Sequence, residues 1–389
     1  MNNDRAGRYV RGIEGYKAYV PNKLPPQPPI DLNSELAMTL SSADHKLGRL
    51  DGVTQVLPNP DLFVAMYVKK EALLSSQIEG TQASLIDVLG VTKDKQGVDG
   101  DVQEVINYVS AMNYALKRIA ELPISLRLLK ETHEILLQSG RGSRKSPGEF
   151  RKSQNWIGPP GCSIDDAIFV PPTVDNMNQE MNDLEKYLHK QDGLPPLIKI
   201  ALIHAQFETI HPFIDGNGRI GRLLITFWLC HQGVLTKPLL YLSHYFKEKR
   251  NEYYEKLMDV RFKGAWEEWI AFFLNGVISV SEEAVLSARR IIELKELKQQ
   301  VLTTNVRNSG NHVRLLESLF VEPLITRPYV MKKFNVSAPT AGNIVKSFVE
   351  CGILTDMTPA QNRNKRFLFD EYLAILSRGT ELDASSSST

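Results

Sequence analysis

Apolar residues recur at the spacing of one helix face along most of this chain, and the pattern predicts a mainly α-helical fold. Helical patterns run from Leu32 through Gly90, after a proline-rich stretch at 21–29 that is predicted to be extended. The clearest of these early helices is predicted at 61–78, where Gly80 is placed to end it. Further helices are predicted at 102–121, 125–138, 197–207, 223–229, 247–262 and 269–280.

Two short apolar segments, Trp156-Ile157 and Ile168-Phe169-Val170, interrupt the helical pattern. The sequence Gly158-Pro159-Pro160-Gly161 lies between them, and glycine and proline are the residues that most often reverse the chain. A β-hairpin that ends at Pro171-Pro172 is therefore predicted within an otherwise helical region.

The C-terminal part follows a different order of elements. A charged helical connector is predicted at 281–303, and after it come helices at 312–320, 328–334 and 339–351 and strands at 353–355 and 366–369. This is the order of a winged helix. The basic residues that could meet nucleic-acid phosphates are Lys346 and, in the loop between the strands, Arg363, Lys365 and Arg366. Winged helices also bind proteins, so both kinds of partner stay open.

These patterns divide the chain into five parts. They are an N-terminal helical region at 1–98 with a turn-rich gap at 93–100, a catalytic domain at 99–280, a helical connector at 281–310, a winged-helix domain at 311–378 and a disordered tail at 379–389.

Composition narrows the class of protein only a little. The formal net charge of +1 gives no sign of a polyanionic partner. The three cysteines, Cys162, Cys230 and Cys351, are too few and too scattered for a disulfide framework or a zinc site. No signal peptide is predicted, and the longest apolar run, 269–280, is too short to span a bilayer. We therefore expect a cytoplasmic protein without a membrane partner, whose oligomeric state, a homodimer included, is left open.

The residues with clear chemistry are concentrated in twelve positions, His211 to Arg222, with the sequence HPFIDGNGRIGR. Gly216 and Gly218 permit a tight turn between two helices, and the free N–H groups of the second helix favour an anion in that turn. Arg219 and Arg222 are three positions apart, so both can reach one polyphosphate from the first helical turn.

Two more residues of this motif suit phosphate chemistry. Asp215 lies at the mouth of the turn, where its carboxylate could hold Mg²⁺ together with the phosphates of a nucleotide. His211 has an ordinary pKa of about 6.5, which suits a base that removes the proton of an incoming hydroxyl near neutral pH. Attack of that hydroxyl on an α-phosphate would release pyrophosphate.

The same twelve residues match the signature His-Pro-Phe-x-Asp/Glu-Gly-Asn-Gly-Arg-x-x-Arg at every specified position, and the chain therefore resembles the Fic domain family. The resemblance implies a Fic (Fido-type) helical bundle that transfers AMP from ATP to a Ser, Thr or Tyr hydroxyl of a protein, itself included. It implies that His211 is the catalytic base and Asp215 the Mg²⁺ ligand. The ATP-binding residues that it implies are Phe213, Gly216, Asn217, Gly218, Arg219 and Arg222.

A second motif lies far upstream, at the end of the helix predicted at 61–78. Ser75 and Glu79 are four positions apart, and a carboxylate in a last helical turn is unfavourable unless a cation pairs with it. The stretch resembles the Ser/Thr-x-x-x-Glu-Gly/Asn inhibitory motif of Fic proteins. This resemblance implies that Glu79 pairs with Arg222, blocks the γ-phosphate and inhibits the enzyme.

Other residues have roles that the residues alone leave open. In Fic domains the hairpin is the flap that holds a target peptide by strand pairing, which here implies Ile168 and Phe169. Tyr254 lies on a helix face that could line the adenine or could equally belong to the core. His204, His231 and His244 lie in apolar helices or at their ends and are expected to be structural.

A second functional interpretation belongs to a different class. The chain could be a DNA-binding regulator whose pocket senses a nucleotide and whose winged helix gives the response. An altered His211 or Asn217 would favour this interpretation, and both residues are intact.

Overall fold

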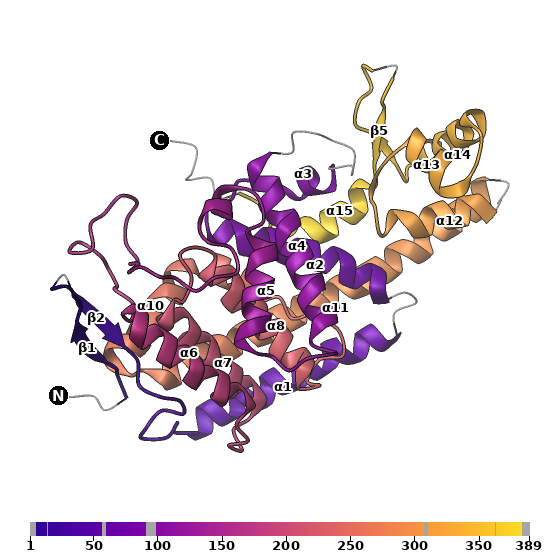
Figure 1. Cartoon of the computed structure of the whole chain (residues 1–389). Coiled ribbons are helices and arrows are strands. Elements are labelled where there is room, and N and C mark those ends of the chain that lie inside the picture. Colours follow the sequence, from indigo (N-terminus) through magenta and orange to yellow (C-terminus); the bar gives the residue numbers. More distant parts are fainter. Residues whose placement is uncertain are drawn as a thin grey trace.

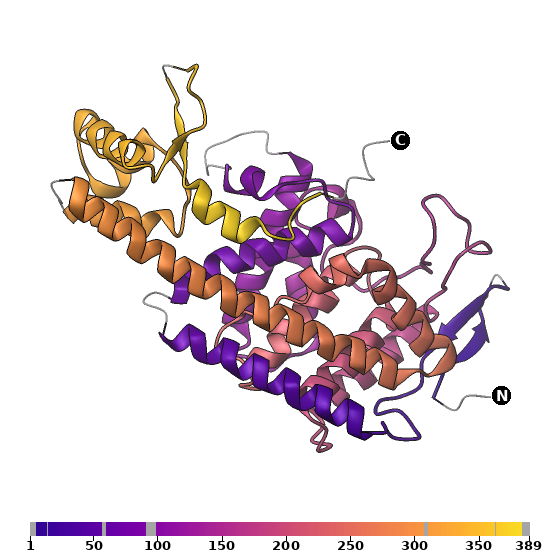
Figure 2. The same cartoon turned by 180° about the vertical axis from the view of Figure 1, so that it is seen from behind.

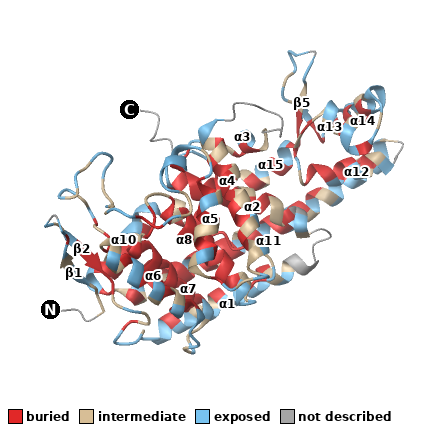
Figure 3. Cartoon of the chain, in the orientation of Figure 1, coloured by how far each residue is buried: buried red, intermediate tan, exposed pale blue. Residues whose placement is uncertain are grey.

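The computed structural model describes residues 5–13, 15–56, 60–90, 99–306, 310–361 and 363–382. Outside these residues lie most of the predicted gap at 93–100 and most of the predicted disordered tail. Residues 307–309, within the predicted connector, also lie outside them. The described chain is mainly helical, as predicted, and buried residues form its centre (Figures 1 and 3). Before the C-terminal part its helices are α1 (Ser34–Val56), α2 (Pro60–Ile78), α3 (Leu85–Leu89), α4 (Gly100–Arg118), α5 (Leu126–Leu136), the 3₁₀ turn η1 (Arg141–Arg144), α6 (Val174–His189), α7 (Pro196–Ile210), α8 (Asn217–His231), α9 (Ser243–Glu248), α10 (Arg250–Lys263) and α11 (Trp266–Asn305).

Helix α7 is the centre of the molecule, because every residue from Leu197 to Ile210 is buried. Helix α8 packs closely against it at Gly221, where a Cβ atom would collide with the Glu208 carboxylate. His204 of α7 joins the surrounding helices, since its Nδ1 lies 3.1 Å from the Gly221 carbonyl and its Nε2 lies 2.9 Å from the Tyr253 hydroxyl. Its predicted structural role agrees with these contacts.

Helix α11 is one continuous helix of 40 residues, so the boundary predicted at 280/281 falls inside it. The reason is that buried positions continue past residue 280 at helical spacing, including Ala284, Ala288 and Ile291. Helix α1 packs along α11 (Figure 2). By length and composition α11 would be able to cross a membrane, but 61% of its most apolar window is buried inside this protein, as in a core helix.

The predicted β-hairpin is present only as a single antiparallel bridge between Ile157 and Phe169. The prediction of two strands was therefore too strong, because the prolines at 159, 160, 171 and 172 cannot donate the hydrogen bonds that would extend a ladder. The sequence patterns also missed a hairpin near the N-terminus, β1 (Arg8–Arg11) with β2 (Lys17–Val20). Strand β2 supports the predicted flap, since the Tyr19 N–H donates to the Val170 carbonyl at 2.9 Å.

The helix predicted at 247–262 is two helices, α9 and α10, with a break at Lys249, where φ is −105° and ψ is 34°. The break brings the Phe246 and Tyr253 rings into a stack, with centroids 4.5 Å apart. Because both rings are buried against His204 and Trp269, a straight helix would lose this aromatic packing.

The C-terminal part lies at the far end of α11 from the N-terminal hairpin (Figure 1). It contains a three-stranded antiparallel sheet in the order β3-β5-β4, and two of its elements, β3 and α15, were not predicted. Helix α15 returns to pack on α11 and α2. The elements are α12 (Gly310–Leu319), β3 (Leu324–Thr326), α13 (Arg327–Phe334), α14 (Ala338–Glu350), β4 (Thr355–Asp356), β5 (Arg366–Leu368) and α15 (Asp370–Ser377).

We expect Trp269→Ala to destabilise the protein by about 3–5 kcal/mol, the usual cost of truncating a buried aromatic side chain. Trp269 is fully buried, and its indole N–H donates to the Ala201 carbonyl of α7 at 2.9 Å. Urea unfolding measures the change. The control is Leu297→Ala in the same helix, where the side chain is 51% exposed and the expected change is below about 0.5 kcal/mol. Equal changes in the free energy of unfolding for the two variants would contradict the packing of α11 against α7 in the core.

Candidate active site

The motif loop joins the end of α7 to the start of α8. His211 ends α7 in a left-handed conformation, with φ of 51° and ψ of 60°, because the following Pro212 cannot continue the helix. Gly216 takes a second left-handed conformation, with φ of 78°, and α8 begins at the next residue. A non-glycine residue in the left-handed region is uncommon and is found most often at functional sites.

Asn217 holds this loop closed. Its side-chain oxygen accepts a hydrogen bond from the Phe213 N–H at 2.8 Å, and its side-chain nitrogen donates to the Phe213 carbonyl at 2.8 Å. The sequence suggested that Asn217 itself tolerates a left-handed conformation, but this conformation belongs to Gly216 and Asn217 is the first residue of α8. Gly218 is also helical, so among these residues only Gly216 needs the conformational freedom of glycine.

His211 is held through its backbone. Its carbonyl accepts hydrogen bonds from Arg151 Nε at 3.1 Å and from Asn155 Nδ2 at 3.3 Å, and the Arg151 N–H donates to the Pro212 carbonyl at 2.9 Å. Asn155 also donates to the Phe213 carbonyl at 2.9 Å. Arg151 and Asn155 come just before the hairpin in the chain. Their hydrogen bonds therefore connect the motif loop to the start of the predicted flap.

The surroundings of His211 favour its neutral form. Burial has the largest effect, and together with the guanidinium charges of Arg261 and Arg151 it lowers the pKa of His211 to about 4. The Glu208 backbone and the Glu79 carboxylate oppose this shift without reversing it. Of the two ring nitrogens, Nδ1 is buried. A neutral imidazole at physiological pH is the form that can accept a proton.

His133 of α5 contacts the motif loop and was not among the site residues predicted from the sequence. Its Nδ1 accepts from the Gly148 N–H at 2.9 Å, so Nε2 carries the proton and donates to the Asp215 carbonyl at 3.0 Å. The Phe213 ring stacks on the His133 ring at 3.8 Å and is completely buried. The Phe213 side chain therefore packs beneath the loop, and in this structure it does not face the predicted nucleotide site.

Arg222 is buried and makes three hydrogen bonds with the end of α2. It donates to Glu79 Oε1 at 2.6 Å, to the Ser75 hydroxyl at 2.8 Å and to the Ser75 carbonyl at 3.0 Å. Gly218 allows this arrangement, because a Cβ atom there would collide with the Glu79 carboxylate. Although burial opposes the change, the Arg222 charge lowers the pKa of Glu79. The pairing of Glu79 with Arg222 that the upstream motif implied is thus present.

Arg219 faces different carboxylates. Its Nη2 lies 3.3 Å from Asp215 Oδ1, and its Nη1 lies 3.6 Å from Glu104 Oε2 of α4. The side chain is buried, yet Nε and Nη1 have no hydrogen-bond partner among the described residues. Buried donors in a folded protein are normally paired, so these two groups are suited to the oxygens of a ligand.

Asp215 is the one residue of the motif that fits a metal ion. Its Oδ1 accepts from the Gly216 N–H at 2.6 Å and lies near Arg219, whereas its Oδ2 has no hydrogen bond among the described residues. No group of three or more possible ligands occurs in the described part of the chain. A hard oxygen on a partly exposed carboxylate would suit Mg²⁺ only if phosphate oxygens and water supplied the rest of its shell.

The remaining predicted residues differ in how far they are exposed to solvent. Tyr254 is 40% exposed, whereas the neighbouring Leu257 and Tyr253 are buried in the core. Burial first, and then the Glu79 charge, raise the pKa of Tyr254 to about 12, so the Tyr254 phenol lies on the same side of the site as the Glu79 carboxylate. On the hairpin, Ile168 is 60% exposed, but Phe169 is buried against Tyr19, Phe262 and the Arg261 guanidinium.

The sequence analysis missed the residues that hold the motif in place. They are Glu104, His133, Arg141, Arg151 and Asn155, which come from four segments upstream of the motif, namely α4, α5, η1 and the stretch before the hairpin. The stretch Gly148-Glu149-Phe150-Arg151 leads into the hairpin, but a single arginine in a turn gives no sign that it binds a distant carbonyl. Their roles depend on contacts between helices far apart in the sequence.

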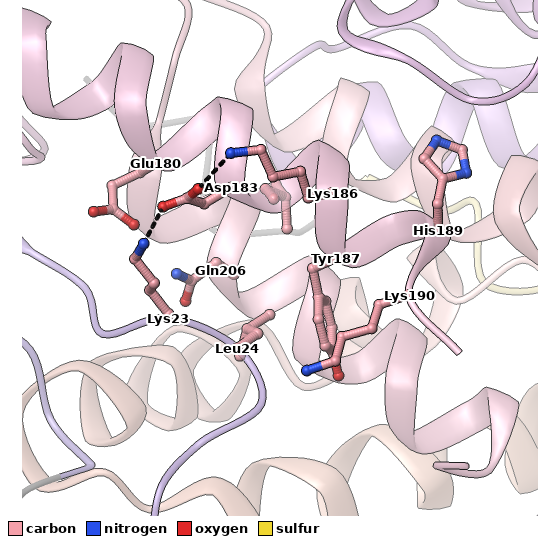
Figure 4. Close-up of a pocket in the computed structure, with 10 residues that line it drawn as sticks. Lys23, Leu24, Glu180, Asp183, Lys186, Tyr187, His189, Lys190 and Gln206 are labelled. Atoms are coloured by element: carbon pink, nitrogen blue, oxygen red, sulfur yellow. Dashed lines mark hydrogen bonds and ion pairs between the residues drawn. The ribbon is translucent and has the colours of Figure 1, made fainter. Parts of the chain in front are cut away.

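A cavity of about 490 Å³ lies away from this motif, between the proline-rich segment and α6 (Figure 4). Asp183 lies at its centre, 2.8 Å from Lys23 and 3.3 Å from Lys186. The residues of the motif do not line it. Because the motif residues lie elsewhere, this cavity is not the candidate active site.

Comparison with known proteins agrees with this geometry. Residues 37–117 match the model of the Fic/DOC family N-terminal region, and residues 123–229 match the model of the Fic/DOC family. Over these two stretches the chain is similar to the Fic/DOC family. The N-terminal match includes Ser75 and Glu79, and the second match includes the whole motif.

Curated relatives match about half of the chain. The protein adenylyltransferase Fic of Drosophila grimshawi is 31% identical over 201 residues, which are 49% of this chain and 38% of that protein. The protein of the same name from Drosophila mojavensis is 30% identical over 230 residues, 56% of this chain and 41% of that protein. The chain thus spans about two fifths of the length of these relatives.

A Fic family protein of Desulfovibrio desulfuricans G20 has a solved crystal structure that resembles this one. The TM-score is 0.57 at 22% sequence identity, and the match covers 88% of this chain and 98% of that chain. The likeness extends beyond the two family matches and shows a shared fold.

We expect His211 to stay neutral from pH 8 down to about pH 5, because its pKa is lowered to about 4. The ¹⁵N chemical shifts of its imidazole, assigned by comparison with His211→Ala, should not change over this range. Unfolded histidine takes up a proton near pH 6.5, so folding stability should fall as the pH drops below that value. His211→Ala should lessen this fall in thermal stability. An imidazole that titrates near pH 6.5 in the folded protein would contradict the description of the site.

Proposed function

We propose that this protein is a protein adenylyltransferase that moves AMP from ATP to a Ser, Thr or Tyr hydroxyl. The observation that carries the proposal is that a neutral His211 lies next to the start of α8, where the buried Arg219 has two donors without hydrogen-bond partners among the described residues and Arg222 is held by Glu79 and Ser75. The names of the Drosophila relatives support the same activity.

In the proposed reaction His211 is the general base. This role requires the tautomer whose one proton is on Nδ1, because Nε2 must then accept the proton of the acceptor hydroxyl. The hydroxyl oxygen then forms a bond to the α-phosphorus of ATP, and the bond from this phosphorus to the bridging oxygen breaks. Pyrophosphate leaves with that electron pair, and AMP stays on the acceptor.

The other groups of the motif would hold the triphosphate during this displacement. The N–H groups in the first turn of α8 and the Arg219 guanidinium point to the place where negative charge accumulates. Asn217 keeps these groups in position through the Phe213 backbone. Asp215 would hold Mg²⁺, which when bound neutralises phosphate charge.

We propose that the enzyme is self-inhibited by Glu79. The Glu79 carboxylate and Ser75 use three donor groups of Arg222, so this arginine is not free for a phosphate. A carboxylate beside the start of α8 would also repel a triphosphate. Both effects weaken productive binding of ATP, and the Glu79 charge has only the smallest of the effects on the pKa of His211, which stays low.

The flap would hold the acceptor segment by its backbone. The backbone groups of Phe169 already pair with Ile157, at 2.8 and 3.1 Å, whereas Ile168 makes no backbone hydrogen bond among the described residues. The free edge at Ile168 is therefore the better candidate for strand pairing with a target. Phe169 anchors the flap through its buried ring.

We further propose a winged helix at residues 311–378, which is supported by the order of helices and strands there and by the three-stranded sheet. The DNA-binding alternative gains no support from its proposed basic residues. Lys365 pairs with Asp356 at 2.6 Å and Lys346 with Glu350 at 3.5 Å. These cations are engaged within their own domain, and no observation favours nucleic acid over protein.

We expect weak AMP transfer in the wild-type protein. The initial rate of transfer should rise about tenfold or more in Glu79→Gly, because the release of Arg222 for phosphate binding would stabilise the transition state by about 1.4 kcal/mol or more. Incubation with radiolabelled ATP and Mg²⁺ measures the initial rate of label entering protein. Addition of His211→Ala to Glu79→Gly should abolish transfer while ATP binding remains. Arg222→Ala should not reproduce the rise, because it also removes the phosphate ligand.

The four proteins separate the two parts of this proposal. Equal rates for wild type and Glu79→Gly would refute self-inhibition and leave the transfer activity standing. Full transfer by the variant that lacks His211 would refute the mechanism.

A separate prediction concerns the metal. In the Glu79→Gly background, Asp215→Asn should slow transfer and shift its dependence on Mg²⁺ to higher concentration, with only partial recovery at excess Mg²⁺. The asparagine keeps an acceptor for the Gly216 N–H, so it serves as a conservative change, and Asp215→Ala should be at least as slow. A Mg²⁺ titration identical to that of the parent would remove Asp215 from this role.

A further inference from the structure

A third arginine lies at the edge of the site, outside the sequence motif. Arg141 of η1 makes a two-point contact with the Glu104 carboxylate, at 2.7 Å from Nε to Oε1 and 3.0 Å from Nη2 to Oε2. Glu104 is buried, whereas the Arg141 side chain is 58% exposed. The same Oε2 atom lies 3.6 Å from Arg219, so one carboxylate lies between the two guanidiniums.

The turn that carries Arg141 is fixed on α4. Asn107 of α4 donates to the Ser139 carbonyl at 3.1 Å and to the Ser139 hydroxyl at 3.0 Å. Gly140 has φ of 85°, and its close approach to α4 would bring a Cβ atom within 3.3 Å of the Glu104 Cγ. An exposed arginine on a turn this firmly attached loses little freedom when it binds a ligand.

The position of Arg141 indicates which end of a bound triphosphate would lie near it. Its Nη2 lies 3.4 Å from the Thr81 hydroxyl, and Thr81 follows Glu79 by two residues. The arginines whose charges act on the His211 imidazole, near which the α-phosphorus must lie, are instead Arg261 and Arg151. Arg141 is therefore on the Glu79 side of the site, toward the phosphates that leave.

The carboxylates on this side of the site are shared between the two arginines. Glu104 faces both Arg141 and Arg219, Asp215 lies 3.3 Å from Arg219 Nη2, and Arg219 Nε and Nη1 have no hydrogen-bond partner among the described residues. A further carboxylate, Asp101, lies 3.7 Å from Arg141 at the surface, where solvent screens its charge. Phosphate oxygens would give hydrogen-bond partners to these Arg219 donors and to the exposed Arg141 guanidinium.

We infer that Arg141 is a third phosphate-binding arginine, held in place by Glu104, which contacts the phosphates beyond the α-phosphate of ATP. This inference rests on the proposed function, since it assumes that the triphosphate lies along the start of α8. It predicts a binding role that AMP, which lacks these phosphates, does not use.

The test compares Arg141→Ala with Arg144→Ala, both in the Glu79→Gly background. Arg144 lies in the same 3₁₀ turn and is exposed, so it is a matched control for loss of charge. Titration calorimetry with Mg²⁺ should show ATP binding weakened about tenfold or more by Arg141→Ala and less than about twofold by Arg144→Ala. AMP should bind both variants as it binds the parent. Arg141→Lys should recover only part of the ATP affinity, because lysine lacks the two-point contact.

The outcomes separate binding from folding and from catalysis. Equal weakening of ATP and AMP by Arg141→Ala would show a structural role and overturn the inference, as would ATP affinity equal to that of the Arg144 variant. Because the readout is binding, it stays informative if the Glu79→Gly protein binds ATP but transfers no AMP, a result that defeats only the proposed function. Absence of ATP binding in the parent itself would defeat both.

Discussion

Burial of two guanidinium groups at the start of one helix is the constraint on which the rest of this site depends. Arg219 and Arg222 are both buried where α8 begins, a place whose helix dipole already carries partial positive charge. Buried charge without a counter-charge is strongly unfavourable. The structure resolves this with carboxylates from two other helices and the loop, namely Glu79, Glu104 and Asp215. A triphosphate would meet the same need, and in the proposed self-inhibition it would compete with Glu79 for one set of donors.

Two other arginines act on His211, the proposed catalytic base. Arg151 and Arg261 add to the effect of burial in keeping the pKa of His211 low, and each also has a structural contact. Arg151 binds the His211 carbonyl, and Arg261 donates to the Glu208 carbonyl at 3.0 Å. A histidine near these cations is neutral without needing a carboxylate partner. The arginines that keep His211 neutral are therefore distinct from those proposed to bind phosphate.

The twelve-residue motif predicted the catalytic loop because its function depends on local geometry. Pro212 ends one helix and Gly216 permits the turn before the next, and both effects act within a few residues. The upstream pair Ser75 and Glu79 was predicted for the same reason, since its helical spacing is visible in the sequence. Glu104, Arg141 and His133 could not be predicted this way, because α4 and α5 meet α8 only through tertiary packing. The hairpin was predicted as two strands but is a single bridge, because its prolines cannot extend a ladder. The boundary predicted inside α11 was wrong, because the buried apolar face continues past residue 280.

Removal of Glu79 from Arg222 is restricted by how firmly α2 is held. Every residue from Glu71 to Ile78 is buried, so the helix cannot slide without exposing core side chains. Near its end, Gln77 donates to the Thr380 carbonyl at 3.0 Å and accepts from Lys247 at 2.9 Å, which ties it to the segment after α15 and to α9. Glu79 itself lies beyond the last helical residue and is followed by Gly80, whose φ is 96°. The chain can change direction at that glycine while α2 stays in place. A local change at residues 79–80 therefore disturbs fewer contacts than a movement of the helix, and it frees Arg222 without altering the core that positions α8.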